Sequence, residues 1–480
     1  MKPYELFIGG TWVAPRAGGR FDAVNPFTGK TWAQLGEADA SDVDAAVTAA
    51  AEAQPGWAAT NGATRALILN RIADVIVDHA SEMAVFESTD NGKVIRETSS
   101  QMLFAARLFR FFAGYADKLY GSVIPLDNPH VFDYTRREPY GVIALITAWN
   151  SPITLLCNKL PAALAAGNTV VVKPSEETPL TTTLLGEVMN AVGVPKGVYN
   201  VVHGFGPDSA GAYLTEHPGV DAITFTGETQ TGEVITRAAA KGLRQVSMEC
   251  GGKNAGIVFA DCDIDKAVEG TMRSAFANCG QVCFGTERVY VERPIFEEFV
   301  ARMKAGAEGL KLGAPEAAET TMGPLISNGH KEKVLSYYKL AEEEGATIVT
   351  GGGSPDMGDL NGGAWVQPTI WTGLTDDARV IREEIFGPCC HIAPFDSEDE
   401  VIVRANDTKY GLVTAIWTED LSRAHRVARQ IDVGIVWVNS WFLRDLRTAF
   451  GGAKASGIGR EGGVHGLEFY SELSNVCVKL

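Results

Sequence analysis

The sequence predicts an α/β protein built on parallel β-sheets. Between residues 141 and 259, short apolar runs rich in β-branched residues alternate with segments of helical periodicity. A second stretch of this kind runs from about residue 263 to 440. Such alternation is typical of βαβ units, and the nearly continuous apolar runs indicate strands buried on both faces. The chain has 480 residues, more than the ~250–300 at which single cores stop growing, so we expect two or three domains.

The segment before the first sheet is predicted to be mainly helical. From residue 38 to about 118, apolar residues recur at helical spacing, as in "ASDVDAAVTAAAEAQ" and "RALILNRIADVIVDHASEMAVFES". Ser41 is the expected N-cap of the first helix, because its hydroxyl can accept a bond from a free N–H of the first turn. The segment "GSVIPL…VFDYTRREPYG" then predicts strands interrupted by prolines.

The two alternating stretches supply the strands of the predicted sheets. In the first we expect strands in "GVIALIT", "NTVVVKP", "GVYNVVHG", "VDAITFTG", "RQVSMEC" and "AGIVFA", with helices near 178–191, 207–216 and 228–241. In the second we expect strands in "ERVYVE", "ATIVTGGG", "LVTAIWT" and "GIVWVNS". Open parallel sheets bind ligands at the carboxyl ends of their strands, so functional side chains are expected there.

Composition and charge exclude several classes of function. With 42 basic and 59 acidic residues, the net charge is −17, and no Lys/Arg tract is present, so neither nucleic acid nor a membrane is an expected partner. The N-terminal "MKPYELFIGGTW" lacks the pattern of a signal peptide, and no apolar run reaches the ~18 residues of a spanning helix. The eight scattered cysteines indicate free thiols and a cytoplasmic location, and without a C-x-x-C pair no metal site is expected.

Two motifs at strand ends favour a dinucleotide cofactor. In "VVVKPSEETP", Lys173 can donate to ribose hydroxyls or a phosphate, and Glu176 can accept both hydroxyls of an adenosine ribose. A carboxylate there would repel a 2′-phosphate, so the pair favours NAD over NADP; a surface salt bridge is the alternative. In "TFTGETQTG", Gly227 leads into a helix N-terminus that can face a phosphate, although Glu228 would repel it and an ordinary capped turn is the alternative.

The glycine motif "GIGREGG" is not interpreted as a dinucleotide fingerprint. Its spacing, Gly457, Gly459 and Gly462, fits G-x-G-x-x-G, but a glycine-rich loop precedes it and only 18 residues follow it. The fingerprint requires a preceding strand and an acidic residue ~20 positions further on. We therefore expect a turn near the entrance of the site.

Glu249 and Cys283 are the candidates for chemistry. "SMECGGKN" places Glu249 at a strand end beside two glycines, where a carboxylate in a partly apolar cleft can act as a general base; a buried ion pair is the alternative. "AFANCGQVCFGTERVYV" contains Cys279 and Cys283. A nucleophilic thiol must be reachable and held as a thiolate, but buried packing is the commonest fate of a single cysteine, so the residues alone leave both roles open.

The ordered set of motifs resembles the aldehyde dehydrogenase superfamily along the whole chain. The motifs are "AWNSP", "KPSEETP", "FTGETQTG", "MECGGKN", "GQVCFGTER", "EEIFGP" and "FGGAKASGIGRE". The resemblance implies that Cys283 is the nucleophile, Glu249 the general base and Asn150 the oxyanion-hole donor. Cys279 has no such counterpart. It is expected to lie one helical turn before Cys283 and to be a buried packing residue.

The resemblance also implies NAD as the cofactor and a small-molecule aldehyde as the substrate, oxidised to its carboxylic acid through a cysteine thiohemiacetal and thioester. The implied cofactor contacts are Trp149, Lys173, Glu176, Gly206, Gly227, Glu228, Glu384 and Phe386. Lys173 and Glu176 would meet the adenosine ribose, and Glu384 and Phe386 the nicotinamide ribose.

The family's fold implies three parts. They are a Rossmann-like NAD-binding domain (1–119 and 140–251), an α/β catalytic domain (252–465) and a small β oligomerisation arm (120–139 and 466–480). Through this arm we expect a homodimer or a homotetramer.

From about Gly167 to Leu480 the chain is similar to the family branch that oxidises 2-hydroxymuconic semialdehyde, a carboxylated aldehyde of aromatic catabolism. The stretches "FTGETQTG" and "VNSWFLRDLRTAFGGAKASGIGREGG" show this similarity. Arg444 falls in the C-terminal loop of the family's substrate funnel, where it is expected to bind the substrate carboxylate bidentately, with Phe450 beside the substrate. A salt bridge to Asp445 or another acid is the alternative for Arg444. Two alternative functions are considered. One is a broad-specificity enzyme for benzaldehyde-type or aliphatic aldehydes, and the other is a cofactor-free cysteine hydrolase.

The first third resembles aldehyde dehydrogenases in general more than this branch. Residues 101–104 occupy the place of the branch's second arginine, and Ser151 and Asn158 replace aromatic positions common in the funnel. We therefore expect a mosaic chain with a seam near 165–175, which bears on substrate identity and not on reaction class.

Overall fold

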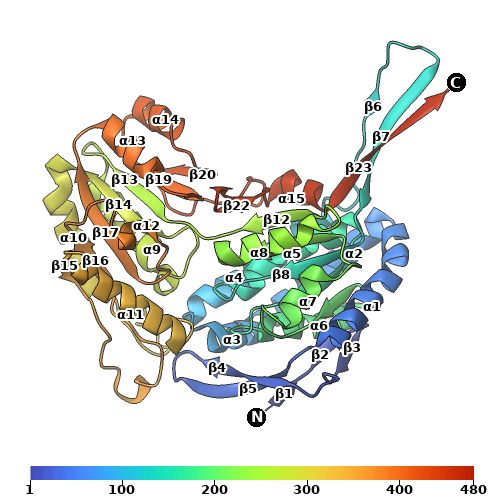
Figure 1. Ribbon diagram of the computed structural model, residues 1–480, viewed down its shortest axis with the longest axis horizontal. Helices are drawn as coiled ribbons and strands as arrows, with labels where there is room; N and C mark the ends of the chain where they lie inside the picture. Colours follow the sequence, from blue (N-terminus) through green and yellow to red (C-terminus); the bar gives the residue numbers. More distant parts are fainter. Residues whose placement is uncertain (1) are drawn as a thin grey trace.

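The computed structural model describes residues 2–480 and contains two α/β units and a projecting β arm (Figure 1). One unit surrounds an eight-stranded sheet and the other a seven-stranded sheet. The arm extends away from both units, and the C-terminus lies at its outer part in Figure 1. The predicted α/β class with parallel sheets is confirmed.

The N-terminal segment forms strands and then four helices. The strands, which the sequence pattern did not indicate, are β1 (Lys2–Tyr4), β2 (Leu6–Ile8), β3 (Thr11–Val13), β4 (Arg20–Asn25) and β5 (Lys30–Gly36). The predicted helical region is confirmed as α1 (Ala40–Ala59), α2 (Gly62–Asp78), α3 (Ala80–Asn91) and α4 (Ile95–Ala113).

The N-cap of α1 is Asp39 and not Ser41. The Asp39 carboxylate accepts bonds from the backbone N–H groups of Ser41 (2.8 Å) and Asp42 (3.0 Å). The hydroxyl of Ser41 donates to the same carboxylate at 2.6 Å. The prediction was wrong because an acidic side chain two residues earlier already satisfies the free donors of the first turn.

The first sheet has the strand order β22–β12–β11–β8–β9–β10–β2–β3, and its central strands, from β12 to β10, are parallel. Its remaining strands are β8 (Val142–Ile146), β9 (Thr169–Lys173), β10 (Tyr199–Val201), β11 (Ala222–Thr226), β12 (Gln245–Glu249) and β22 (Gly457–Ile458). The connecting helices are α5 (Pro152–Ala166), α6 (Leu180–Val192), α7 (Ala210–Glu216) and α8 (Thr229–Ala240). The strands predicted from 141 to 250 are thus present in this sheet.

Helix α5 was not predicted, although it lies against the centre of the first sheet. It begins with Pro152, contains Pro161 and ends at Ala166, followed by Gly167 with a left-handed φ of +98°. Nearly all of its residues are buried. A helix buried on all sides lacks the apolar and polar faces that reveal amphipathic helices, so periodicity did not indicate it.

The second sheet has the order β15–β16–β17–β14–β13–β19–β20, and only the β15–β16 pair is antiparallel. Its strands are β13 (Asn254–Val258), β14 (Thr286–Glu292), β15 (Thr347–Thr350), β16 (Thr369–Thr372), β17 (Cys389–Phe395), β19 (Val413–Trp417) and β20 (Ile435–Val438). The expected strand "AGIVFA" therefore belongs to this sheet and not to the first. Strands β16 and β17 were missed; Pro394 in β17 is unusual for a central strand.

Helices and short turns surround the second sheet. They are α9 (Ile264–Phe276), α10 (Phe296–Glu308), α11 (Asn328–Glu343), α12 (Arg379–Arg382), α13 (Glu398–Asn406) and α14 (Leu421–Ala428), with the 3₁₀ turns η1 (Ala277–Gly280), η2 (Arg293–Ile295) and η3 (Gly358–Leu360). Two short strands, β18 (Tyr410–Gly411) and β21 (Ala453–Lys454), form a separate antiparallel pair. In the sequence, β18 precedes β19 and β21 follows β20.

The projecting arm joins distant parts of the chain. Strand β7 (Val131–Pro139) pairs antiparallel with β6 (Val123–Ile124) and with the C-terminal β23 (Ser471–Lys479), which follows α15 (Gly463–Phe469). Large apolar side chains on it are exposed, among them Phe132, Leu473 and Val478. Within residues 2–480, no helix has the length and apolar character needed to cross a membrane.

Candidate active site

The carboxyl ends of the first sheet bring together polar side chains from neighbouring strands. Lys173 ends β9, Thr226 ends β11, Glu249 ends β12, and Thr147 directly follows β8. Among the described residues, the hydroxyls of Thr147 and Thr226 and the Oε1 atom of Glu249 are buried without a hydrogen-bond partner. Buried polar atoms are seldom left unpaired, so this edge is suited to a ligand that supplies the missing partners.

The loop that carries Cys283 is fixed to both units. Gln281 is fully buried; its Oε1 accepts from the N–H of Ile326 at 2.8 Å, and its backbone carbonyl accepts from the Asn150 side chain at 2.9 Å. The Asn254 side chain donates to the carbonyl of Cys283 at 2.8 Å. The half-buried thiol therefore lies on a loop with little freedom to move, beside the predicted donor Asn150.

Cys279 and Cys283 occupy different environments. Cys279 is 1% exposed and packs in a core cluster with side chains such as Met322, whereas Cys283 is half-buried beside Trp441. Both thiols are free. The expected packing role of Cys279 agrees with this burial. The turn η1 that carries it is not a regular helix, because Asn278 and Cys279 have left-handed φ values of +49° and +55°.

The electrostatic surroundings favour a protonated thiol at Cys283 in the unliganded chain. Burial first, and then the charges of Glu249 and Glu384, raise the pKa of Cys283 to about 12. The backbone N–H of Phe284 and the Arg444 guanidinium act in the opposite direction. A thiolate at neutral pH thus requires a proton acceptor at the site.

Glu249 is 5% exposed and lies beside a buried ion pair that sequence reasoning missed. Burial, and next the charge of Glu461, raise the pKa of Glu249 well above that of an ordinary glutamate. Glu461 pairs with Lys159 of α5, whose side chain is fully buried. The one available sequence signal was a lysine in the largely apolar stretch "LLCNKLPAAL". A carboxylate with a raised pKa is suited to proton transfer near neutral pH.

Arg444 lies near Glu249 and Glu461 but forms an ion pair with neither of them. Its Nη2 donates to the side-chain oxygen of Asn158 at 3.2 Å, and its guanidinium lies 4.2 Å from the centre of the Phe450 ring. Its Nε is buried and unbonded among the described residues. The alternative of a salt bridge to Asp445 is not observed, since that carboxylate pairs with Arg447 at 2.6 Å.

The predicted adenosine-ribose contacts lie together. Lys173 is 5% exposed, and its ammonium donates to Glu176 at 3.0 Å and to the carbonyl of Pro174 at 3.1 Å. A Cβ on Gly206 would meet no atom within 4 Å, so this glycine borders open space. The surface salt bridge considered as the alternative is present, but its lysine is buried, which leaves only the Glu176 side exposed.

Gly227 and Glu228 stand where β11 passes into α8. The N–H of Gly227 donates to the carbonyl of Glu249 at 3.1 Å, which ties this turn to the next strand. Glu228 occupies the N-cap position of α8, but its exposed side chain accepts no bond from the first turn. The first-turn N–H groups of α8 are therefore not occupied by this carboxylate.

A second loop places Phe386 beside Trp149 and Glu384 beside Gly252. Glu384 accepts from the N–H of Gly252 at 2.8 Å, and burial first, then Glu287, raise the pKa of Glu384 to about 8. The rings of Phe386 and Trp149 meet edge to face, with centroids 5.3 Å apart. Phe386 has a left-handed φ of +62°, a conformation that a bulky residue adopts only when its surroundings impose it.

Glu287 and Lys253 support the strained loop, and sequence reasoning missed both. They form an ion pair in which the lysine is almost fully buried. Glu287 also accepts from the N–H groups of Ile385 (3.1 Å) and Phe386 (2.9 Å). These bonds hold the left-handed turn in place.

Lys93 is another site residue that the sequence did not indicate. It follows α3, is 3% exposed and donates to the hydroxyl of Ser151 at 2.6 Å. Burial lowers the pKa of Lys93 to about 8, while Glu97 and Glu87 act against this, as does Cys283. Ser151 in turn donates to the carbonyl of Asn150 at 2.7 Å, so Lys93 is linked to the predicted oxyanion donor.

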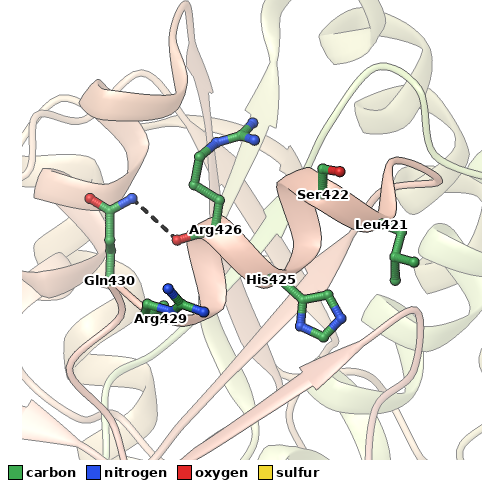
Figure 2. Close-up of a pocket in the computed structure, with 6 residues that line it drawn as sticks. All are labelled: Leu421, Ser422, His425, Arg426, Arg429 and Gln430. Atoms are coloured by element: carbon green, nitrogen blue, oxygen red, sulfur yellow. Dashed lines mark hydrogen bonds between the residues drawn. The ribbon is translucent and has the colours of Figure 1, made fainter.

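A hollow on the outer face of α14 is separate from these residues (Figure 2). It is lined by one helix and its end, residues 421–430, and contains none of the predicted site residues. Arg426, one of its cations, is already bonded to Glu398 at 2.6 and 2.8 Å. Among residues 2–480, no group of three or more His, Cys, Asp or Glu side chains is arranged to hold a metal ion.

Known proteins match this chain over its whole length. A 2-hydroxymuconic semialdehyde dehydrogenase of Pseudomonas sp. (strain CF600) is 61% identical over 486 aligned residues, covering 100% of both chains. A 2-aminomuconic 6-semialdehyde dehydrogenase of Pseudomonas sp. is 52% identical, covering 100% of this chain and 99% of the relative. Both matches include the first third, and neither tests the expected seam near 165–175.

Solved structures of aldehyde dehydrogenases match the fold of this chain over nearly its whole length. A variant of an aldehyde dehydrogenase from Bacillus cereus has a TM-score of 0.97 and 39% identity, covering 100% of this chain and 97% of its own. A betaine aldehyde dehydrogenase variant from Staphylococcus aureus, in complex with NAD⁺, has a TM-score of 0.97 and 36% identity, covering 99% and 96%. The model of the aldehyde dehydrogenase family matches residues 12–476, and the chain belongs to this family.

Proposed function

We propose that this protein oxidises a carboxylated aldehyde to the corresponding acid with NAD, and that 2-hydroxymuconic semialdehyde is the substrate. The observation that carries the substrate class is Arg444, a half-buried guanidinium near Cys283 with no carboxylate partner among the described residues. Guanidinium groups bind carboxylates through two parallel bonds, so a substrate acid group would complete this site. The names of the two Pseudomonas relatives support the same class.

The residues at the first sheet fit NAD. The buried Lys173 and the Glu176 carboxylate can hold an adenosine ribose, and the unpaired hydroxyls of Thr147 and Thr226 lie at the sheet edge where dinucleotides bind. Glu384, Phe386 and Trp149 would border the nicotinamide end, and Gly206, Gly227 and Glu228 the stretch between. When bound, NAD supplies the acceptor for the hydride of the aldehyde carbon.

Cys283 and Asn150 carry out the first covalent step. The Cys283 thiol gives its proton to a water molecule, and its sulfur attacks the aldehyde carbon to form a thiohemiacetal. The Asn150 side chain and the backbone N–H of Cys283 donate to the resulting oxyanion, and losing one such donor typically costs ~2.7–4 kcal/mol. The hydrogen bonds around Gln281 hold donor and nucleophile in fixed positions before substrate arrives.

Glu249 carries out the second step. After loss of the hydride a thioester remains on Cys283, and Glu249 takes a proton from a water molecule that attacks it. The free acid then leaves. Burial and the charge of Glu461 raise the pKa of Glu249, while Lys159 acts in the opposite direction. A carboxylate with a raised pKa is suited to proton transfer.

We further propose the roles of the parts of the chain. Residues 1–119 and 140–251 form the NAD-binding domain, 252–465 the catalytic domain, and 120–139 with 466–480 an oligomerisation arm. The exposed apolar side chains of the arm support pairing with other copies as a dimer or tetramer. The eight free thiols support a cytoplasmic location.

The test is a comparison of kcat/KM for 2-hydroxymuconic semialdehyde and benzaldehyde in the wild type and in Arg444→Ala. We expect the variant to lose ~2–5 kcal/mol of transition-state stabilisation on the carboxylated aldehyde, because the carboxylate of the substrate is left without a partner in the site. Benzaldehyde turnover should change little. Arg447→Ala is the matched control, since that arginine is exposed and paired with Asp445.

Equal losses on both aldehydes in Arg444→Ala would make this arginine structural and would remove the support for a carboxylated substrate. A wild type that prefers benzaldehyde would favour the broad-specificity alternative. Oxidation of the aldehyde without an increase in NADH absorbance at 340 nm would contradict the reaction class itself.

A further inference from the structure

Helix α5 and its N-cap residue, Ser151, carry three polar side chains along one side. Ser151, Thr154 and Asn158 are three and four residues apart, the spacing at which side chains line one side of a helix. Between Pro152 and Ala166 the other residues are apolar apart from Lys159, which pairs with Glu461. The three side chains span about 10 Å of helix. They therefore form a polar stripe on an otherwise apolar, buried element.

Both ends of this stripe meet cations near Cys283. Lys93 donates to the Ser151 hydroxyl at 2.6 Å, and Arg444 donates to the Asn158 carbonyl oxygen at 3.2 Å. Ser151 bonds to the carbonyl of Asn150, the predicted oxyanion donor, at 2.7 Å. The Phe450 ring under Arg444 meets the ring of Phe284, the residue after Cys283, with centroids 5.9 Å apart. The stripe thus borders the space in front of the nucleophile, where substrate must lie.

The hydrogen-bond capacity of the stripe is incomplete. The Thr154 hydroxyl and the Nε of Arg444 are buried without partners in the described part of the chain. Asn158 is only 5% exposed, and although its oxygen binds Arg444, its NH₂ group donates to no acceptor among residues 2–480. All three unused groups are donors. Donors that converge on a site beside a cation are completed by an anion with several acceptor lone pairs.

We propose that Asn158 determines substrate specificity by forming, with Arg444, a clamp for the carboxylate of the aldehyde. Its carbonyl oxygen orients the guanidinium, whose Cζ lies over the Phe450 ring, 4.2 Å from the ring centre. Its NH₂ group donates to the carboxylate that the guanidinium binds. The inference rests on the proposed carboxylated substrate and adds a second residue to its recognition.

An amide is the side chain that can perform both tasks. An aspartate at this position would orient Arg444 equally well but would neutralise it and repel the incoming carboxylate. An apolar side chain would leave the guanidinium unoriented. Asn158 keeps the positive charge available while still accepting a hydrogen bond from it.

The experiment measures kcat/KM for 2-hydroxymuconic semialdehyde and for benzaldehyde in wild type, Asn158→Asp, Asn158→Ala and Arg444→Ala. We expect Asn158→Asp to lose about 100-fold or more on the carboxylated aldehyde through like-charge repulsion. Asn158→Ala should lose about tenfold through one missing hydrogen bond. Benzaldehyde should change by less than about threefold in both variants.

A second readout is binding of the dicarboxylate muconate, measured by calorimetry without turnover. Its Kd should rise in Asn158→Asp and, to a smaller degree, in Asn158→Ala. Asn190→Asp, an exposed asparagine of α6, is the matched control and should change neither measurement. Thermal unfolding shows whether Asn158→Asp is folded; if it is not, Asn158→Ala decides the proposal.

The outcomes separate this inference from the proposed function. If Arg444→Ala removes the preference for the carboxylated aldehyde while the Asn158 variants lose both aldehydes equally, the clamp is overturned and the substrate class stands. If Asn158→Ala keeps the wild-type preference and muconate affinity, the clamp is also overturned. A wild type without any preference for the carboxylated aldehyde contradicts both.

Discussion

Two sets of charged side chains, one made of Lys253 and Glu287 and the other of Glu249 and Arg444, differ in how they are satisfied. In the second unit, Lys253 and Glu287 form an ion pair, and Glu287 also accepts from the N–H groups of Ile385 and Phe386. At the first sheet, Glu249 has a buried oxygen with no partner, and Arg444 is bonded only to a neutral amide. The two sets have similar compositions but different degrees of pairing.

This difference separates structural charges from reactive ones. A charge that is paired and hydrogen-bonded has no capacity left for a ligand, and removing its partner destabilises the fold. A buried charge with unused capacity costs stability and persists at sites where a substrate or a proton will use it. We therefore expect substitutions in the two sets to have opposite signatures: loss of stability in the first and loss of activity in the second.

The largest effect should follow from replacing the proposed nucleophile, Cys283. Cys283→Ser should lower kcat by at least about 10³-fold, because a serine hydroxyl is a far weaker nucleophile without thiolate character. NAD binding and the unfolding transition should be retained, as measured by fluorescence titration and thermal unfolding. Cys279→Ser is the control, since that thiol is buried packing; near-normal turnover in Cys283→Ser would remove the assignment.

The paired set should show its role in stability. Lys253→Met leaves Glu287 as a buried charge without its partner, and we expect the free energy of unfolding to fall by ~3–5 kcal/mol. Urea denaturation measures this change, with Arg447→Met, an exposed cation, as the control. A variant that keeps full stability but loses turnover would show that the pair acts in chemistry, contrary to the comparison.

Lys173 and Glu176 are paired but partly exposed, so their degree of pairing lies between those of the two sets. Of the three substitutions, the one at this pair should change its measured quantity least. Their bond is 3.0 Å, with the lysine side chain buried and the glutamate side chain 36% exposed. Glu176→Gln removes the charge that would repel a 2′-phosphate, so the kcat/KM preference for NAD over NADP should fall about tenfold, corresponding to ~1.4 kcal/mol. Steady-state kinetics with both cofactors test this, and an unchanged preference would place cofactor selection elsewhere.

The parts of the fold with a clear local pattern could be predicted from the sequence. Apolar β-branched runs indicated β8 to β12, and the polar residues at their ends, Lys173 and Glu249, were found because parallel strands end at one edge. Buried helix α5 escaped prediction because it has no polar face to set a period. Strand β17 escaped because Pro394 argues against a central strand.

The charge network of the site could not be predicted, since it depends on contacts between distant residues. Lys159 and Glu461 are 302 positions apart, and Arg444 and Asn158 are 286 apart. Local sequence suggested Asp445 as a partner for Arg444, yet the adjacent carboxylate bonds Arg447 instead. Which charges are paired is decided by how the C-terminal loop packs on α5, and no local pattern records that packing.

The central claim is that the unpaired Glu249 serves the reaction and not the fold, and Glu249→Gln tests it most directly. Rapid-mixing kinetics with NAD and 2-hydroxymuconic semialdehyde should give a burst of NADH approaching one per Cys283, followed by steady turnover lowered by about 10²–10⁴-fold. Stability should be unchanged or higher, because a buried charge without a full set of partners has been removed. Steady turnover at the wild-type rate, or a destabilised protein without a burst, would contradict the account.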